Sequence, residues 1–261
     1  MKKNIYKIIG FILTVSIIAT LPAITALAEE KAAKEKKVKW GIAVSAWFPS
    51  VQGKASAGNE IDYKDTLGLD NKNGVSVFPT YGADSKGKWD AGYETFSFES
   101  DKQVNDSFQF NKGRFDSGNQ IHSELDIEYV RLKYMPSYKE AGNSNFSMVC
   151  GLGYSKFDIS LRNKSTANGT VEKSFHSLLP TIGARFETGR SSPTVYYAEL
   201  NGMSLKHKGY ISDMEAGFAH SFSSKAVFRG GYRSVHLKAV QKDDFAKATL
   251  QGPFAEMRYK F

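Results

Sequence analysis

The chain ends in ATLQGPFAEMRYKF (Ala248–Phe261), a segment in which polar and apolar residues alternate. Apolar side chains fall at every second position from Pro253 onward, and Glu256, Arg258 and Lys260 lie between them. A period of two places these two sets on opposite faces of a β-strand. The segment therefore predicts a strand with one face in an apolar medium and the other face in a polar one.

An apolar face that ends in Tyr259 and Phe261 resembles the C-terminal signal of outer-membrane β-barrel proteins. In that family the last strand closes the barrel against the first strand and is recognised by the barrel insertion machinery. The resemblance implies that Tyr259 and Phe261 form an assembly signal. It also implies that the chain resides in the cell outer membrane, with outer-membrane lipid and the insertion machinery as its partners.

The beginning of the chain predicts export. Three lysines precede an apolar stretch at residues 8–21, and Ala26-Leu27-Ala28 has the small-x-small pattern of a cleavage site. Residues 1–28 are therefore predicted to be a signal peptide, and the apolar stretch is short for the alternative, a retained membrane anchor. Residues 29–38 are predicted to be a charged periplasmic segment, and residues 39–261 the barrel.

Composition argues against other classes of protein. The formal net charge of +8 falls to +5 without the three lysines of the predicted leader, and the remaining basic residues are interleaved with acidic ones. No recognition helix is visible, so nucleic acid is not an expected partner. Cys150 is the only cysteine, which excludes an intramolecular disulfide and a lipoprotein cysteine.

Alternating segments recur along the chain and predict an all-β fold, a closed antiparallel transmembrane β-barrel of ten strands. The predicted strands are residues 40–48, 88–100, 107–115, 120–135, 146–155, 173–186, 194–205, 210–222, 226–237 and 248–261. Segment 107–115 has the weakest pattern, and eight strands is the alternative if it is a loop. An even number places both ends of the barrel on the periplasmic side.

The long connection at residues 50–87 is predicted to be an extracellular loop with one short helix at residues 62–69, for which Asp62 is the N-cap. Several short motifs resemble a pattern found in uncharacterised outer-membrane barrels of Gram-negative bacteria. They are Trp47-Phe48-Pro49, Ile61-Asp62, Leu67-Gly68-Leu69-Asp70, Gly231-Tyr232-Arg233 and Gly252-Pro253-Phe254. This resemblance implies an architecture and carries no active site.

Charged residues on the polar faces of the strands are predicted to point into the barrel lumen. A basic side chain that faces lipid near the midplane costs about 2–4 kcal/mol, so the charged face of each strand is assigned to the interior. The predicted lumen network comprises Glu124, Asp126, Glu128, Asp213, Glu215, Arg229, Arg233, Glu256 and Arg258. Two registers of the hairpin at residues 210–237 are open, one with Asp213 and one with Glu215 opposite Arg233.

Few residues are candidates for catalysis. Three His-Ser dipeptides begin at His122, His176 and His220, but neighbours in a strand point to opposite faces. Ser234 and His236 share a face and are the remaining candidates for a nucleophile and its base. In the segment 70–74 a lysine stands where calcium needs an oxygen ligand, so a turn is favoured and neither a metal nor a cofactor is expected.

Together these observations predict a non-enzymatic outer-membrane protein with a structural role, or a narrow channel or binding site for a small solute. Two alternatives are an outer-leaflet lipid-modifying hydrolase and a surface adhesin that acts through the first loop. A barrel of about eight to ten strands is mostly filled by its own side chains, which argues against wide, porin-like flux.

Overall fold

The computed structural model describes residues 39–69, 74–83, 87–136, 142–165 and 169–261. The predicted signal peptide, the charged segment 29–38 and the turn at residues 70–73 lie outside these ranges. Within them the chain is all-β, and one antiparallel sheet of twelve strands dominates. Its strands are β1 (Lys39–Trp47), β2 (Ser50–Ala57), β3 (Asn59–Asp62), β4 (Gly74–Ala83), β5 (Gly87–Gln103), β8 (Gln120–Met135), β9 (Ser144–Asn163), β10 (Thr170–Thr188), β11 (Thr194–Leu205), β12 (Gly209–Ser221), β13 (Ala226–Gln241) and β14 (Asp244–Lys260).

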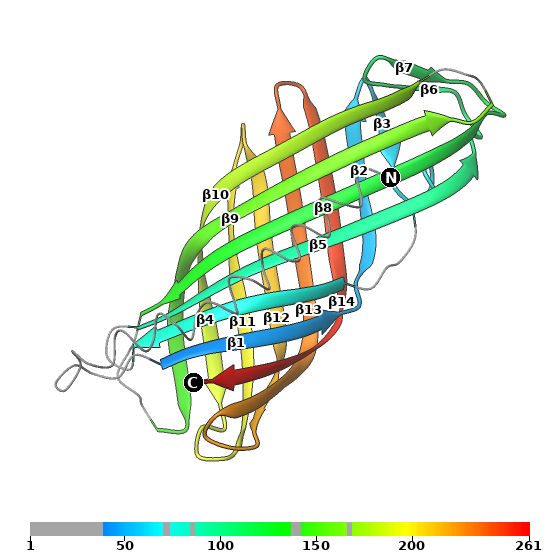
Figure 1. Cartoon of the computed structure of the whole chain (residues 1–261). Coiled ribbons are helices and arrows are strands. Elements are labelled where there is room, and N and C mark those ends of the chain that lie inside the picture. Colours follow the sequence, from blue (N-terminus) through cyan, green and yellow to red (C-terminus); the bar gives the residue numbers. More distant parts are fainter. Residues whose placement is uncertain (1–38, 70–73, 84–86, 137–141, 166–168) are drawn as a thin grey trace, which may run out of the picture. The chain divides into compact units, whose positions relative to one another are not determined.

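Pairing between neighbouring strands follows the chain and returns to its beginning. β1 pairs with β4, the pairing continues through β5 and β8 to β14, and β14 pairs again with β1. Figure 1 shows these strands side by side, with β1 next to β14. β14 also extends beyond β1, so that Met257 pairs with Val44 in β1 whereas Thr249 pairs with Gln52 in β2.

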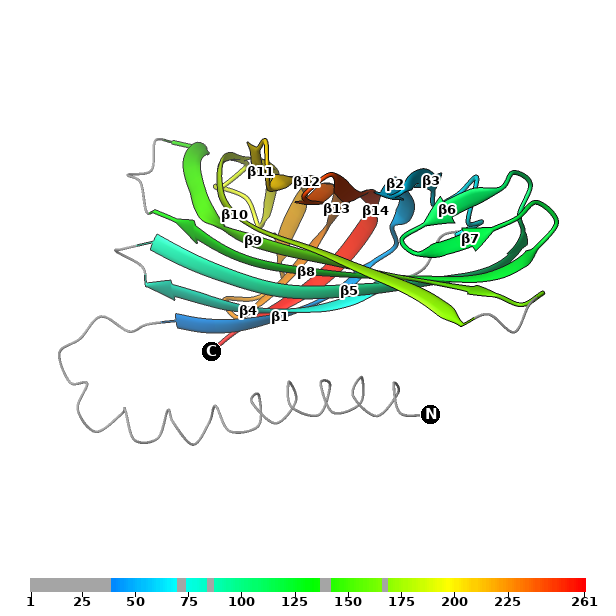
Figure 2. The same ribbon diagram turned by 90° about the horizontal axis from the view of Figure 1, so that it is seen from above.

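Ten strands take part in this circuit, although they are not the ten that the sequence predicts. β4 lies inside the expected long loop. Its Pro79 argues against a strand in the sequence, because proline cannot donate a backbone hydrogen bond to a neighbouring strand. Segment 107–115 instead forms a separate hairpin of β6 (Phe108–Phe110) and β7 (Gly113–Phe115). Figure 2 shows this hairpin at the same end of the structure as β2 and β3, which we call the distal end. The end near the C-terminus is the proximal end.

Residues 62–69 form a compact turn, not the predicted helix. The Asp62 carboxylate accepts hydrogen bonds from the backbone N–H groups of Lys64 and Asp65, at 2.9 Å each, so it does cap the first turn. The turn does not propagate, because Gly68 has a φ of +70° and reverses the chain in the left-handed region. Leu67 and Leu69 are thereby directed into the core.

The polarity of both faces of the sheet reverses half-way along the strands: the apolar face becomes polar and the polar face becomes apolar. We call the face with buried side chains the inner face and the opposite one the outer face. The outer face of β9 is apolar in the proximal half, at Phe146, Met148, Cys150, Leu152 and Tyr154, and polar in the distal half, at Lys156, Asp158, Ser160 and Arg162. The inner face of β9 changes in the opposite sense and buries Phe157, Ile159 and Leu161 in the distal half.

An apolar core fills the interior of the distal half. Leu125, Phe175 and Leu237 project into it from three strands of the wall, and all are fully buried. Val51, Ile61 and Leu67 enter from the segment after β1, and Phe108, Phe110 and Phe115 enter from the β6–β7 hairpin. Burial of each side chain of this size contributes about 1.5–3 kcal/mol to the free energy of folding. The interior of the distal half is therefore packed like the hydrophobic core of a water-soluble domain.

Candidate functional site

The proximal half has a charged interior, which we call the interior charge cluster. It contains seven acidic and seven basic side chains, so their formal charges cancel. Its members are Lys88, Asp90, Glu94, Arg131, Lys133, Arg185, Glu187, Glu199, Asp213, Glu215, Arg229, Arg233, Glu256 and Arg258.

Arg233 is central to the part of this cluster nearest the apolar core. Its Nε and Nη2 atoms donate to the two carboxylate oxygens of Asp213, each at 2.9 Å, in a bidentate pair. Its Nη1 atom donates to Glu94 Oε1 at 2.5 Å, and Arg131 donates to the same oxygen at 2.9 Å. Lys133 Nζ lies 2.5 Å from Glu199 Oε1. Removal of one partner would therefore leave a buried charge uncompensated.

A second set of ion pairs lies around Arg229. Arg229 donates to Glu256 at 2.9 Å and also bonds Glu215, and its guanidinium carbon lies 4.7 Å from the centroid of the Tyr197 ring. Arg258 bridges Glu256 at 3.1 Å and Asp90 at 3.3 Å. A cavity lined by Asp90, Glu215 and Arg229 and by other members of the cluster measures about 20 Å³, which is room for a single water molecule.

The structure places six of the nine predicted lumen residues in this cluster. They are Asp213, Glu215, Arg229, Arg233, Glu256 and Arg258. In the β12–β13 pairing Glu215 lies directly opposite Arg233, which selects the second of the two predicted registers. Arg233 nevertheless bonds Asp213, and Glu215 bonds Arg229, because the side chains reach diagonally across the strands.

The other three predicted lumen residues require a correction. Glu124, Asp126 and Glu128 lie on the outer face of β8, while Leu125 and Ile127 between them are buried in the apolar core. These acids belong to the distal half, where the outer face is polar. Asp126, for example, accepts a hydrogen bond from the outward-facing Ser97 of the neighbouring strand.

Sequence reasoning missed eight members of the cluster: Lys88, Asp90, Glu94, Arg131, Lys133, Arg185, Glu187 and Glu199. The signal that could have found them is a change of parity. In β8 the apolar positions shift from odd to even numbers at the consecutive residues Tyr129 and Val130. Arg131 and Lys133 follow on the inner face. The parity that assigns Glu124, Asp126 and Glu128 to the lumen would instead have placed these two residues in lipid.

Ser234 and His236 lie together on the outer face of β13. Ser234 Oγ is 3.1 Å from His236 Nε2, and His236 Nδ1 is 3.0 Å from Thr249 Oγ1 on β14. All three residues are half-buried. In the strand pairing Gln251 lies opposite Ser234, and Ser212 of β12 lies opposite His236.

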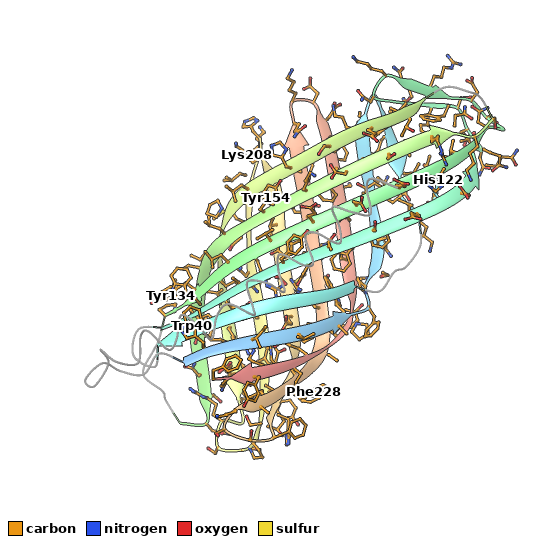
Figure 3. All side chains as sticks on the ribbon, viewed as in Figure 1. Trp40, His122, Tyr134, Tyr154, Lys208 and Phe228 are labelled. Carbon is orange, nitrogen blue, oxygen red and sulfur yellow. The ribbon has the colours of Figure 1, made fainter. Side chains whose placement is uncertain are left out.

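His122 belongs to a different outer-face group, near the distal end of β8 (Figure 3). Its Nδ1 lies 2.8 Å from Asp101 Oδ1, and Lys164 Nζ lies 2.7 Å from the same oxygen. The hydrogen bonds from Lys164 and then His122 hold the pKa of Asp101 below its usual value. The Asp101 side chain is 57% exposed, so this is a surface ion pair. Ser123, next to His122, is buried on the inner face.

Aromatic side chains gather on the outer face of the proximal half. Trp40, Tyr134 and Phe228 lie toward that end in Figure 3. The Tyr259 and Phe261 rings meet edge-on, with centroids 5.2 Å apart, and the Phe261 N–H donates to the Trp40 carbonyl at 2.8 Å. Rings at this level are typical of a membrane interface.

In the part of the chain that the structure describes, no three His, Cys, Asp or Glu side chains are grouped to hold a metal ion. No helix in those same ranges has the length and hydropathy needed to cross a membrane.

An apolar outer face, a charged interior and a sheet that returns to its first strand define the class of outer-membrane β-barrel folds. The structure resembles the outer membrane protease OmpT from Escherichia coli, with a TM-score of 0.52 and 9% identity, over 87% of this chain and 99% of that chain. Two further solved structures are weaker matches. The translocator domain of autotransporter NalP from Neisseria meningitidis has a TM-score of 0.44 and 9% identity, over 94% of this chain and 96% of that one. Ail, the attachment invasion locus protein of Yersinia pestis, has a TM-score of 0.38 and 10% identity, over 84% and 98%.

No protein-family model matches the sequence, and no curated protein matches it. At 9% identity the likeness to OmpT shows a shared fold and carries no activity across to this chain.

Proposed function

We propose that this chain is a sealed, ten-stranded outer-membrane β-barrel with a structural role. The proximal half spans the membrane, and the distal half projects from the cell surface as a solid head. The apolar outer face of β9 supports this placement, because Phe146–Tyr154 is nine residues long and a spanning β-strand needs about 9–11. Lys156 and the polar positions after it then lie beyond the lipid.

The observation that carries the proposal is the filling of the interior at both levels. Paired charges occupy the membrane half, and an apolar core with Phe98, Ile127 and Phe157 occupies the head. An ion that entered from either end would have to lose its water in that core, at a cost of several kcal/mol. The packing therefore favours a closed barrel over the narrow channel that the sequence left open.

The first loop also takes a structural role in this proposal. Tyr63, Leu67 and Leu69 are at most 1% exposed, so the residues that an adhesive loop would offer to a partner are part of the core of the head. Any surface interaction of the head would use its polar outer face.

Conductance of the refolded full-length protein in a planar bilayer tests the proposal. We expect no stable single-channel openings, and reproducible openings would overturn the sealed interior. Residence in the outer membrane is tested separately by fractionation of the producing cells. Recovery of the protein with the inner membrane would contradict the placement.

A further inference from the structure

We infer that Ser234, His236 and Thr249 form an ester-hydrolysing site that opens toward the outer leaflet and acts on the acyl esters of anionic lipids. The inference uses the membrane placement proposed above, but its test is done in micelles and does not depend on whether the barrel conducts. Its first support is the hydrogen-bond chain from Ser234 Oγ through both ring nitrogens of His236 to Thr249 Oγ1, at 3.1 and 3.0 Å.

This chain of bonds can hold the imidazole in the tautomer that a general base needs. When Nδ1–H donates its hydrogen bond to Thr249 Oγ1, the lone pair of Nε2 points at the Ser234 hydroxyl. Ser234 and His236 are two residues apart in β13 and so share a face, and Thr249 is the direct partner of His236 in β14. Rigid paired strands thus position all three side chains.

The site lies at the level where the outer face changes from apolar to polar. Tyr232 and Pro253 are the next outward positions toward the proximal end, and the Tyr232 side chain is 52% exposed. Toward the distal end the next outward positions are Lys238 and Lys247. The ester groups of a membrane lipid lie between its hydrocarbon and its headgroup, which is the level of Ser234 in this placement.

The two lysines indicate the charge of the lipid. Lys238 and Lys247 face each other directly in the β13–β14 pairing, and their Nζ atoms lie 4.7 and 5.8 Å from the centroid of the Phe245 ring. Among the described residues no carboxylate lies within ion-pair distance of either lysine; Glu60, the nearest acid to act on Lys247, forms its ion pair with Lys54, which lies opposite Lys247 on β2. Like charges directly opposite destabilise a sheet, and the phosphate of a lipid headgroup would relieve this repulsion.

The reaction balances with water as the only co-reactant. Ser234 Oγ attacks the ester carbonyl carbon while its proton passes to His236 Nε2, and the tetrahedral adduct then breaks its bond to the alcohol oxygen. The alcohol leaves with the proton from Nε2, and the acyl group stays on Oγ. Water then attacks the acyl group by the same proton route and releases the fatty acid. Gln251, opposite Ser234, presents a carboxamide donor on the neighbouring strand for the developing oxyanion.

The test is covalent labelling of the refolded full-length protein in micelles by a long-chain alkyl fluorophosphonate, read as a mass shift of the intact chain. We expect one adduct, located on Ser234, and none in Ser234→Ala. Ser212→Ala is the matched control, because Ser212 is a serine on the same face of the neighbouring strand, directly opposite His236, and it should label like the parent. His236→Ala should slow labelling by about 100-fold or more. Absence of an adduct, or equal labelling of Ser234→Ala, would overturn the site.

Thr249 is a positioning residue, and a conservative rescue distinguishes this role from a purely structural one. Thr249→Val removes the acceptor and should slow labelling by about 10-fold, whereas Thr249→Ser keeps the acceptor and should label like the parent. Equal rates for the two variants would show that Thr249 does not orient His236. Folding of each variant is checked by its migration on an unheated gel.

Lipid preference tests the lysine pair. The parent should release fatty acid faster from phosphatidylglycerol than from phosphatidylcholine in mixed micelles. A double Lys238→Gln, Lys247→Gln variant should lose that preference. Equal hydrolysis of both lipids by the parent would remove the anionic substrate from the proposal.

Discussion

The guanidinium carbon of Arg233 lies 4.7 Å from the centroid of the Trp47 ring. The same ring packs edge-on against Phe96, with centroids 5.3 Å apart, and its Nε1 donates to the Gly252 carbonyl at 3.1 Å. Trp47 therefore contacts both the interior charge cluster and the apolar core. Its ring makes a cation–π contact with Arg233 in the charged half and packs against Phe96 in the apolar half.

Trp47→Ala should lower the free energy of unfolding by about 3–5 kcal/mol, because it removes a buried ring and the surface that covers Arg233. Denaturant unfolding of the refolded protein measures this loss. Trp40→Ala is the control, since Trp40 lies in the same strand but is 45% exposed on the outer face. Equal losses for the two variants would contradict the assignment of the two faces of β1.

Asp213→Asn should destabilise the barrel by about 3–5 kcal/mol, because the variant leaves Arg233 and Lys133 facing a neutral amide inside the charge cluster. Glu128→Gln removes one carboxylate charge in the same way but acts on the outer face of the head. There the change should stay within about 0.5 kcal/mol. The pair of variants is compared by denaturant unfolding, and a large effect of Glu128→Gln would return that residue to the interior.

Cysteine labelling in lipid vesicles should locate the boundary between lipid and water. Cys150 is exposed on the apolar part of β9, so it should react with a lipid-soluble maleimide and poorly with a charged one. Glu128→Cys, made together with Cys150→Ser, should react readily with the charged reagent. Fast reaction of Cys150 with the charged maleimide would place that part of β9 outside the membrane.

Gly68→Ala should loosen the turn at residues 62–69. A Cβ at this position would lie 2.9 Å from Ser100 Oγ, and the φ of +70° adds about 1–2 kcal/mol of backbone strain. Limited proteolysis should then cut the segment 50–69 faster than in the parent. Gly169→Ala is the control, because nothing lies within 4 Å of its added Cβ, and it should leave the cleavage rate unchanged.

Deletion of Phe261 should impair assembly more than stability. Its side chain is 71% exposed, so the loss of burial is below the full value of about 1.5–3 kcal/mol, and refolding into detergent should stay nearly complete. The amount in the outer membrane should fall sharply if the residue is read by the insertion machinery. Lys260→Ala should change neither quantity. Equal outer-membrane levels of the deletion and the parent would refute the assembly signal.

The sequence was sufficient for the fold class because alternation is a local property. It identified β12 and β13 as a hairpin and offered two registers, one of which has Glu215 opposite Arg233. It was insufficient for β4, whose Pro79 reads as a break, and for the hairpin of β6 and β7, which alternates like a wall strand but forms a two-stranded sheet of its own.

The charged interior was only half predictable, for a physical reason. Reading one parity along a whole strand assumes that each face meets one medium throughout. In β8 the outer face meets the apolar medium at Leu132 and a polar one at Glu124, and the inner face changes in reverse. Residues on either side of the change therefore obey opposite rules, and no single parity could assign both Glu128 and Arg131.

β14 pairs with three strands. One is β13, which directly precedes it in the chain, and the other two are β1 and β2, which lie far from it in the sequence. The ribosome completes this strand after every other strand described here. A chain cut short before β14 would leave β1, β2 and β13 with unpaired edges, which are templates for aggregation. Such a fragment could close neither half of the structure, so it would stay a substrate for chaperones and proteases. Synthesis of β14 is in this way a condition for accumulation of the folded protein.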